Sequence, residues 1–195
     1  IERAGLFSLR DIPDLDRIMA WIEKHNAKRG VVVGGGYIGL EVVEQLHRRG
    51  LELSIVEAQA QVMAPLDAEV AEVLHREIRG KGIGLFLGDG VSTFVEPDAG
   101  ETGQSVVVTK SGKRLPADIV ILGLGVKPEV RLAAEAGIKV GARGGIVVDQ
   151  MLKTSVQNVW AAGDCIEVQD FITGSPAVVP LAGPANRQGR IIANN

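Results

Sequence analysis

Cysteine and aromatic side chains are scarce in this chain of 195 residues, which has one cysteine, Cys165, and seven Phe, Trp and Tyr residues together. A lone cysteine excludes a disulfide scaffold and leaves a zinc-type site without thiolates, so we predict no metal and a reducing, cytoplasmic compartment. Seven aromatic rings are too few for the stacking platforms that bind single-stranded nucleic acid.

A surplus of charge and long apolar runs are missing as well. Lys and Arg number 21 against 24 Asp and Glu, which makes the net charge −3. This balance gives no electrostatic reason to expect nucleic acid or an anionic membrane as a partner. The longest informative apolar run, residues 119–126, contains two glycines and is far shorter than the ~20 residues that cross a bilayer. We therefore predict neither a nucleic-acid nor a membrane partner.

An initiating methionine and a recognisable signal peptide are also missing, because the chain begins Ile1-Glu2-Arg3. We therefore expect a processed or excised piece of a longer protein. What the sequence does contain is an apolar fraction of 46%, enough for a packed core. It also contains 25 glycines, about 13% of the chain against a usual ~7%, which indicates many tight turns and close backbone approaches.

The first part of the sequence alternates between helical and strand patterns. The predicted elements are a helix over 12–22 with Pro13 in its first turn, a strand over 31–33, a glycine-rich turn over 34–39, a helix up to Gly50, a strand over 51–56, and a helix over 70–80 whose apolar residues are Val70, Val73, Leu74 and Ile78. This βαβα order predicts a parallel sheet with right-handed crossover helices.

The second part is richer in turns and short extended segments. The predicted elements are strands over 91–96, over 105–110 and around Leu115, a buried strand over 119–122, a short helix over 129–136, extended segments at 146–148 and 158–161, a turn at 163–164, and a terminal helix from about residue 183. The whole pattern predicts an α/β fold with a parallel sheet, crossover helices and a β-meander. A change of domain is expected between residues 126 and 145.

Gly34, Gly36 and Gly39 form the pattern GxGxxG between a predicted strand and a predicted helix. The first glycine permits the sharp turn, the second lets the backbone touch a pyrophosphate, and the third lets helix and strand pack closely. The phosphates would bind the free N–H groups of the helix N-terminus. Ile38 lies inside this fingerprint and belongs to the predicted cofactor-binding set.

Glu57 lies 21 residues beyond Gly36, at the end of the second predicted strand. A carboxylate there can accept hydrogen bonds from both adenosine ribose hydroxyls and would repel a 2′-phosphate. No Lys or Arg occurs within residues 58–66, so NAD(H) is favoured over NADP(H). The alternative is a glycine-rich loop with an unrelated surface glutamate, but the flanking strand, the following helix and the spaced carboxylate together argue against it.

Four motifs in order resemble those of the pyridine nucleotide-disulfide oxidoreductases, flavoproteins with two dinucleotide-binding folds. They are VVGGGYIGLE at 32–41, ADIVILGLGVKP at 117–128, TSVQNVWAAGDC at 154–165 and PLAGPANRQGR at 180–190. The chain is most similar to the branch of coenzyme A-disulfide reductases, NADH oxidases and persulfide reductases.

The resemblance implies a Rossmann-like FAD/NAD(P)-binding fold and a domain plan. Residues 1–13 would be a connector from the FAD domain, 14–125 the NAD-binding domain, and 126–195 the C-terminal half of the FAD-binding domain. The N-terminal FAD half, the family's redox cysteine and the dimerisation domain are absent from these 195 residues. Half of the FAD site is not expected to hold FAD tightly, so we expect the fragment alone to be inactive.

The resemblance also implies roles for residues of the NAD-binding domain. Tyr37 would cover the flavin ring and swing aside for nicotinamide, and Glu41 would lie near the nicotinamide and the flavin. Gly123 and Gly125 would line the NAD cleft with backbone. The alternatives are a packing residue for Tyr37, a half-buried salt-bridged acid for Glu41, and a plain strand-end turn for the two glycines.

In the last third, the resemblance places Gly163 and Asp164 at the ribityl or pyrophosphate part of FAD, with helix capping as the alternative role for Asp164. Leu181 and Ala182 would face the flavin pyrimidine at a helix N-terminus. Cys165 is not the family's reactive cysteine, because that residue precedes the NAD domain.

The function implied is hydride transfer from NADH to FAD and on to a cysteine-based disulfide, persulfide or oxygen-derived acceptor. A small-molecule disulfide, a persulfide or dioxygen would be the partner, and the intact protein would be a homodimer. Two alternatives remain open. One is a non-catalytic NAD(H)-binding module, and the other is a flavoprotein of the ferredoxin-reductase type that passes electrons to a protein.

Overall fold

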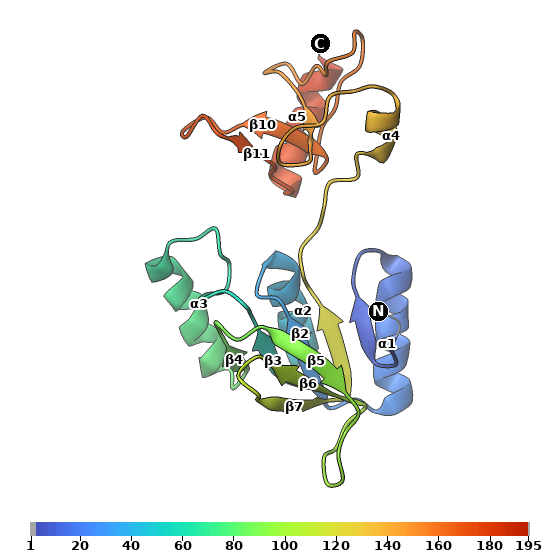
Figure 1. Ribbon diagram of the computed structural model, residues 1–195, viewed down its shortest axis with the longest axis vertical. Coiled ribbons are helices and arrows are strands. Elements are labelled where there is room, and N and C mark those ends of the chain that lie inside the picture. Colours follow the sequence, from blue (N-terminus) through green and yellow to red (C-terminus); the bar gives the residue numbers. More distant parts are fainter. Residues whose placement is uncertain (1–2, 195) are drawn as a thin grey trace. The chain divides into compact units, whose positions relative to one another are not determined.

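The computed structural model describes residues 3–194, which divide into two compact units, 3–125 and 126–194, each described here by itself. A five-stranded sheet forms the centre of the first unit (Figure 1). Its strands, in spatial order, are β1 (Leu6–Ser8), β8 (Ile119–Leu122), β2 (Arg29–Val33), β3 (Glu52–Val56) and β4 (Gly84–Phe86). All neighbouring pairs in this sheet are parallel. The predicted α/β fold with a parallel sheet is confirmed.

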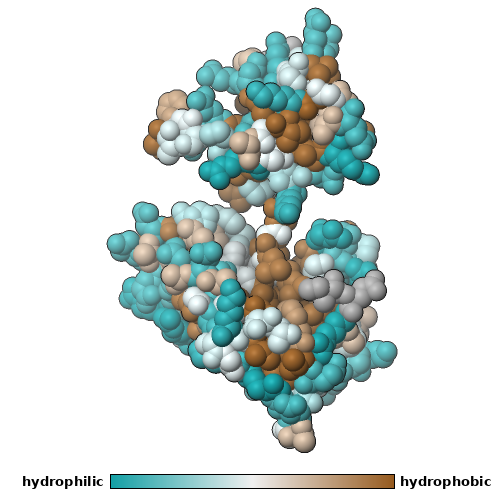
Figure 2. Space-filling view, viewed as in Figure 1, coloured by the Kyte–Doolittle hydropathy of each residue, from teal (hydrophilic) through white to brown (hydrophobic). Residues whose placement is uncertain are grey.

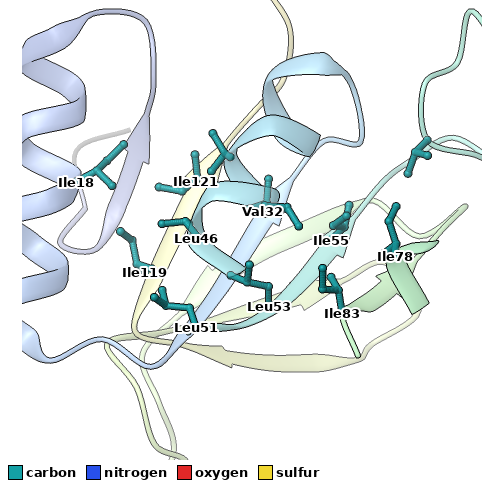
Figure 3. Packing of buried hydrophobic residues seen from close by; sticks show 13 residues of the cluster. Ile18, Val32, Leu46, Leu51, Leu53, Ile55, Ile78, Ile83, Ile119 and Ile121 are labelled. Atoms are coloured by element: carbon teal, nitrogen blue, oxygen red, sulfur yellow. The ribbon is translucent and has the colours of Figure 1, made fainter. Parts of the chain in front are cut away.

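Helices cover one face of this sheet and a small antiparallel sheet covers the other. The helices are α1 (Ile12–His25), α2 (Tyr37–Arg48) and α3 (Ala68–Gly80), and the second sheet consists of β5 (Val91–Val95), β6 (Ser105–Thr109) and β7 (Arg114–Ala117). Side chains alternate between the two faces along each strand. Val32 therefore packs with the helices, as Figure 3 shows, whereas Val31 and Val33 pack with the antiparallel sheet.

Helix α1 is delimited by local signals in the sequence. The Asp11 side chain accepts a hydrogen bond from the Asp14 backbone N–H at 2.8 Å, which satisfies one of the donors at the helix start. Pro13 stands in the first turn, as the sequence predicts, where a missing N–H costs nothing. Asn26 adopts a left-handed conformation with φ of +46° and ends the helix.

Two elements of the first unit differ from expectation. Residues 6–8, which fall in the predicted connector 1–13, form the edge strand β1. In α3, Val70 and Val73 are 52% and 59% exposed, while Ala71, His75 and Ile78 are buried. The buried residues repeat at intervals of four and three and so share one helix face. Of the four apolar residues in the predicted pattern, Ile78 is buried and Leu74 packs against the core, whereas Val70 and Val73 are exposed.

The second unit contains short elements. They are α4 (Arg131–Glu135), β9 (Ile146–Val147), β10 (Ile166–Gln169), β11 (Pro176–Ala177) and α5 (Ala182–Ala193). Residues 158–161, predicted to be extended, contribute only an isolated bridge between Trp160 and Lys153. Within residues 3–194, no helix combines the length and apolar character needed to cross a membrane.

Asp118 joins three elements at the amino-terminal ends of the strands, opposite to the glycine-rich turn. Its side chain accepts hydrogen bonds of 2.9 Å from the backbone N–H groups of Lys28 and Arg29, and the Arg29 guanidinium lies 3.3 Å away. Its carbonyl accepts a 2.9 Å bond from the Trp21 indole on α1. Burial opposes ionisation of this carboxyl, but the two backbone donors and Arg29 outweigh it and lower the pKa of Asp118 below its ordinary value of 3.8.

We expect Asp118→Ala to lower the free energy of unfolding by about 2 kcal/mol, because two backbone donors lose a charged acceptor. Urea titration of the chain at neutral pH measures this, with the exposed Asp16→Ala as the control. Since folding lowers the pKa, the contribution of Asp118 is fully present above its ordinary pKa and is lost as the pH falls through the lowered value. Equal losses of stability on acidification for wild type and Asp118→Ala would contradict this role.

Candidate functional site

Three parallel strands end at the same level, and the residues that follow them form the candidate site. Val33 of β2 pairs with Val56 of β3 and with Leu122 of β8. Strand β2 lies between β3, which follows it in the sequence, and β8, which comes much later in the sequence. In open α/β sheets this switch point, at the carboxyl ends of the strands, is where ligands bind. The residues next in sequence are Gly34, Glu57 and Gly123.

The fingerprint turn depends on the close approach of three glycines. Gly34 has φ of +105°, and a Cβ on it would overlap the carbonyl oxygen of Gly123. A Cβ on Gly39 would overlap the carbonyl oxygen of Gly34, and one on Gly123 would come within 3.2 Å of the Gly39 Cα. Side chains at Gly34 or Gly39 would therefore force β2, β8 and the start of α2 apart.

Gly36 occupies a different environment. Among the described residues, no atom lies within 4 Å of a Cβ built on Gly36, so the absence of a side chain there leaves open space rather than permitting packing. Gly36 is the N-cap of α2, and no described side chain caps this helix. The first-turn N–H groups and the positive end of the helix dipole therefore face open space, an arrangement that can bind an anion.

The Glu57 carboxylate closes the other side of the turn. One oxygen accepts a 2.7 Å hydrogen bond from the Gly35 backbone N–H, and the other accepts a 2.7 Å bond from that of Gln59. A carboxylate has about four acceptor positions, so two remain for the ribose hydroxyls. Glu57 is half-buried, which leaves it open to a ligand. These contacts fit the adenosine ribose of NAD(H).

Tyr37 and Glu41 lie one turn apart at the start of α2. Tyr37 is 55% exposed, which is more than a packing residue would show. The Glu41 side chain is exposed and makes no ion pair or hydrogen bond with residues 3–194, so the alternative of a half-buried, salt-bridged acid is wrong. The Ile38 side chain packs against the core, which leaves its backbone as the part that a cofactor could meet.

The turn after β8 contains both predicted cleft glycines. Gly123 is buried, and its N–H donates a 2.7 Å hydrogen bond to the Val33 carbonyl. Gly125 is exposed with φ of +87°, and no described residue lies within 4 Å of its Cβ position. Gly123 therefore serves packing, whereas Gly125 leaves free space.

The sequence-predicted FAD residues lie in the second unit. Gly163 has φ of +83°, and its N–H donates a 2.8 Å hydrogen bond to the Gln188 side chain of α5. This bond ties the Gly163-Asp164 turn to the helix that Leu181 and Ala182 begin. Asp164 is exposed and makes no hydrogen bond or ion pair with the rest of 3–194, so capping does not explain it.

Sequence reasoning missed the loop that follows Glu57. The Met63 N–H donates a 2.9 Å hydrogen bond to the Gly35 carbonyl, and the Val62 N–H donates a 3.2 Å bond to the ring of His75. These residues touch the fingerprint only through tertiary contacts, so no spacing rule indicates them. Across residues 3–194, no group of three or more His, Cys, Asp or Glu side chains is arranged to hold a metal.

The family model for pyridine nucleotide-disulphide oxidoreductases matches residues 4–189. The chain belongs to this family. The matches include a structure with bound NADH and a relative described as FAD-dependent, so NAD(H) and FAD are the family's cofactors, as the sequence predicts. The glycine turn, the open space at Gly36 and the free acceptor positions of Glu57 fit the first of these.

Among the relatives of this chain is an NADH oxidase from Methanocaldococcus jannaschii, 37% identical over 98% of the chain and 42% of the relative. Reduced CoADR-RHD of Bacillus anthracis superposes with a TM-score of 0.88 at 43% identity, over 97% of this chain and 33% of that one. An NAD-dependent persulfide reductase from A. fulgidus gives 0.89 at 34% identity, over 98% and 35%. The chain thus spans less than half the length of each.

Replacing single glycines separates the folding role of the turn from its binding role. We expect Gly39→Ala to lower the free energy of unfolding by about 3 kcal/mol, because its Cβ meets backbone. Gly36→Ala is expected to change stability by less than ~0.5 kcal/mol and to weaken NAD⁺ binding about tenfold by filling the phosphate space. Urea unfolding and calorimetric titration with NAD⁺ measure the two effects. Unchanged NAD⁺ affinity in Gly36→Ala would contradict the assignment.

Proposed function

We propose that the intact protein is an NADH-dependent flavoprotein oxidoreductase, in which a hydride from NADH passes to FAD and then to a cysteine-based disulfide, a persulfide or an oxygen-derived acceptor. The observation that carries this proposal is the glycine turn at the switch point, with Glu57 at the adjoining strand end. Family membership supports the chemistry. NADH supplies the hydride and FAD accepts it, while the protein determines their distance and polarity.

In this proposal, residues 14–125 form the NAD-binding domain, 126–195 form the C-terminal half of the FAD-binding domain, and 1–13 connect it to the preceding FAD half. The backbone of Gly34, Gly36, Ile38 and Gly39 would bind the pyrophosphate of NADH, and Glu57 would bind its ribose. The division of the described residues at 125–126 supports this domain plan. The fragment alone is expected to be inactive.

Tyr37 and Glu41 are proposed to act where the nicotinamide binds. Residues four apart on a helix share a face, and both side chains are exposed. Tyr37 would shield the flavin and move aside when NADH enters, and Glu41 would orient the nicotinamide. Gly123 and Gly125 would form the backbone of the cleft, and at the open position of Gly125 a side chain would exclude the ring.

Gly163, Asp164, Leu181 and Ala182 are proposed to bind FAD. No described side chain caps α5, so its first N–H groups and dipole are free for the flavin pyrimidine, where they would stabilise negative charge. The Asp164 carboxylate would accept hydrogen bonds from hydroxyls of the ribityl chain.

We also propose that the intact protein is a cytoplasmic homodimer. A single cysteine is consistent with a reducing compartment. Apolar surface on the second unit (Figure 2) supports burial against further parts of the protein or a second subunit. The exposed large apolar residues of this unit include Leu132, Phe171, Ile172, Val179, Leu181 and Ile191.

Anaerobic addition of NADH to the full-length, FAD-loaded protein tests the proposed function. We expect the absorbance band of the oxidised flavin to bleach, and subsequent addition of coenzyme A disulfide, a persulfide or dioxygen to restore it. Bleaching that only a protein acceptor reverses would favour the ferredoxin-reductase type. NADH binding without bleaching would indicate a non-catalytic module and overturn the proposal.

Substitution of Glu57 tests the choice of nucleotide. Glu57→Ala is expected to weaken NADH binding about tenfold, because two ribose hydroxyls lose their acceptor. Glu57→Arg is expected to raise the affinity for NADPH relative to NADH by offering the 2′-phosphate a positive charge. Glu52→Arg, at the exposed opposite end of β3, is the matched control. NADH affinity that is unchanged in both Glu57 variants would sink the assignment.

A further inference from the structure

The loop between β3 and α3, residues 58–67, lies against the fingerprint turn. The Met63 N–H donates its hydrogen bond to the Gly35 carbonyl, and Gly35 N–H in turn donates to Glu57. The Val62 side chain is fully buried, and one of its methyl groups lies only 2.8 Å from the position that a Cβ on Gly35 would take. The loop therefore contacts Gly35 directly and, through the Gly35 N–H, is connected to the Glu57 carboxylate.

His75 on α3 contacts this loop through a side-chain hydrogen bond. Its ring is buried, with 5% of the residue exposed, and its Nε2 accepts the hydrogen bond from the Val62 N–H. Its Nδ1 lies 3.0 Å from a carboxylate oxygen of Glu72. Because Nε2 must present a lone pair to Val62, the hydrogen is on Nδ1 and is donated to Glu72. Glu72 thus selects the tautomer that the loop requires.

We propose that His75 is a positioning residue for the adenosine half of NAD(H), acting through Val62, Met63 and Gly35 on the carboxylate of Glu57. This inference rests on the proposed function, because it concerns the same nucleotide site. His75 does not touch the cofactor. It determines whether the loop presents Gly35 and Glu57 in the arrangement that binds the ribose.

The hydrogen bond to the loop requires an unprotonated Nε2 on His75. A proton on Nε2 would make this nitrogen a hydrogen-bond donor that faces the donor N–H of Val62. The buried Val62 N–H would then have lost its acceptor. The charged groups around the ring are Glu72, which faces Nδ1, Arg79, which lies 3.9 Å from Glu72, and Arg76, which acts on Glu72 through its charge. From the loop, it is the uncharged backbone N–H of Val62 that faces the ring.

His75→Gln and His75→Leu in the full-length, FAD-loaded protein test this inference. Glutamine keeps an uncharged acceptor for Val62, whereas leucine fills a similar volume without one. We expect His75→Leu to weaken the binding of NAD⁺ and of ADP-ribose by the same factor, about tenfold, and His75→Gln to stay within about threefold of wild type. His47→Leu, on α2, is the control and should bind both ligands as wild type does.

His75→Gln keeps the inference testable if the leucine variant does not fold, because the position of the loop requires only an uncharged acceptor for the Val62 N–H. NAD⁺ affinity that falls tenfold or more in a folded His75→Gln, or that is equal in wild type and a folded His75→Leu, would overturn the inference alone. A wild-type protein that fails to bind NAD⁺ would overturn the proposed function with it.

Discussion

The close backbone approach at Gly34, Gly39 and Gly123 is the constraint on which the first unit depends. A Cβ on Gly34 or Gly39 would overlap a carbonyl oxygen of another member of this group. The contact joins the end of β2, the first turn of α2 and the end of β8 at one point. It therefore determines how near the helix lies to the sheet, and with it the space above Gly36.

The binding features follow from that contact. Because α2 starts so close to β2, its uncapped N-terminus points over the strand ends, where the open space at Gly36 can admit a phosphate. Glu57 lies at the end of the neighbouring strand β3, and its carboxylate accepts a hydrogen bond from the Gly35 N–H. In the loop 58–67, the Met63 N–H donates a further hydrogen bond to the Gly35 carbonyl. Folding contacts and binding contacts are thus made by the same few backbone groups.

Local patterns were enough to predict much of the fold. The strand around Val32, the helix that follows the glycine turn and the strand ending at Val56 all form as their apolar spacing indicates. β1 escaped prediction because three residues carry too little periodicity, and it exists through pairing with β8. The apolar pattern of α3 correctly included Leu74 and Ile78, which pack on the core. It did not indicate that His75, which has two hydrogen-bond partners, is buried while Val70 and Val73 are exposed.

By itself the sequence determined the α/β class, the nucleotide fingerprint and the carboxylate at the end of β3, because each follows from residue type and spacing along the chain. Tertiary structure alone decided which glycines pack and which leave space, since that depends on what lies opposite: a carbonyl beside Gly34, nothing within reach of Gly36. It also decided that His75 supports the loop beside Glu57. Contacts between segments distant in sequence leave no periodic signal, so only the tertiary structure shows them.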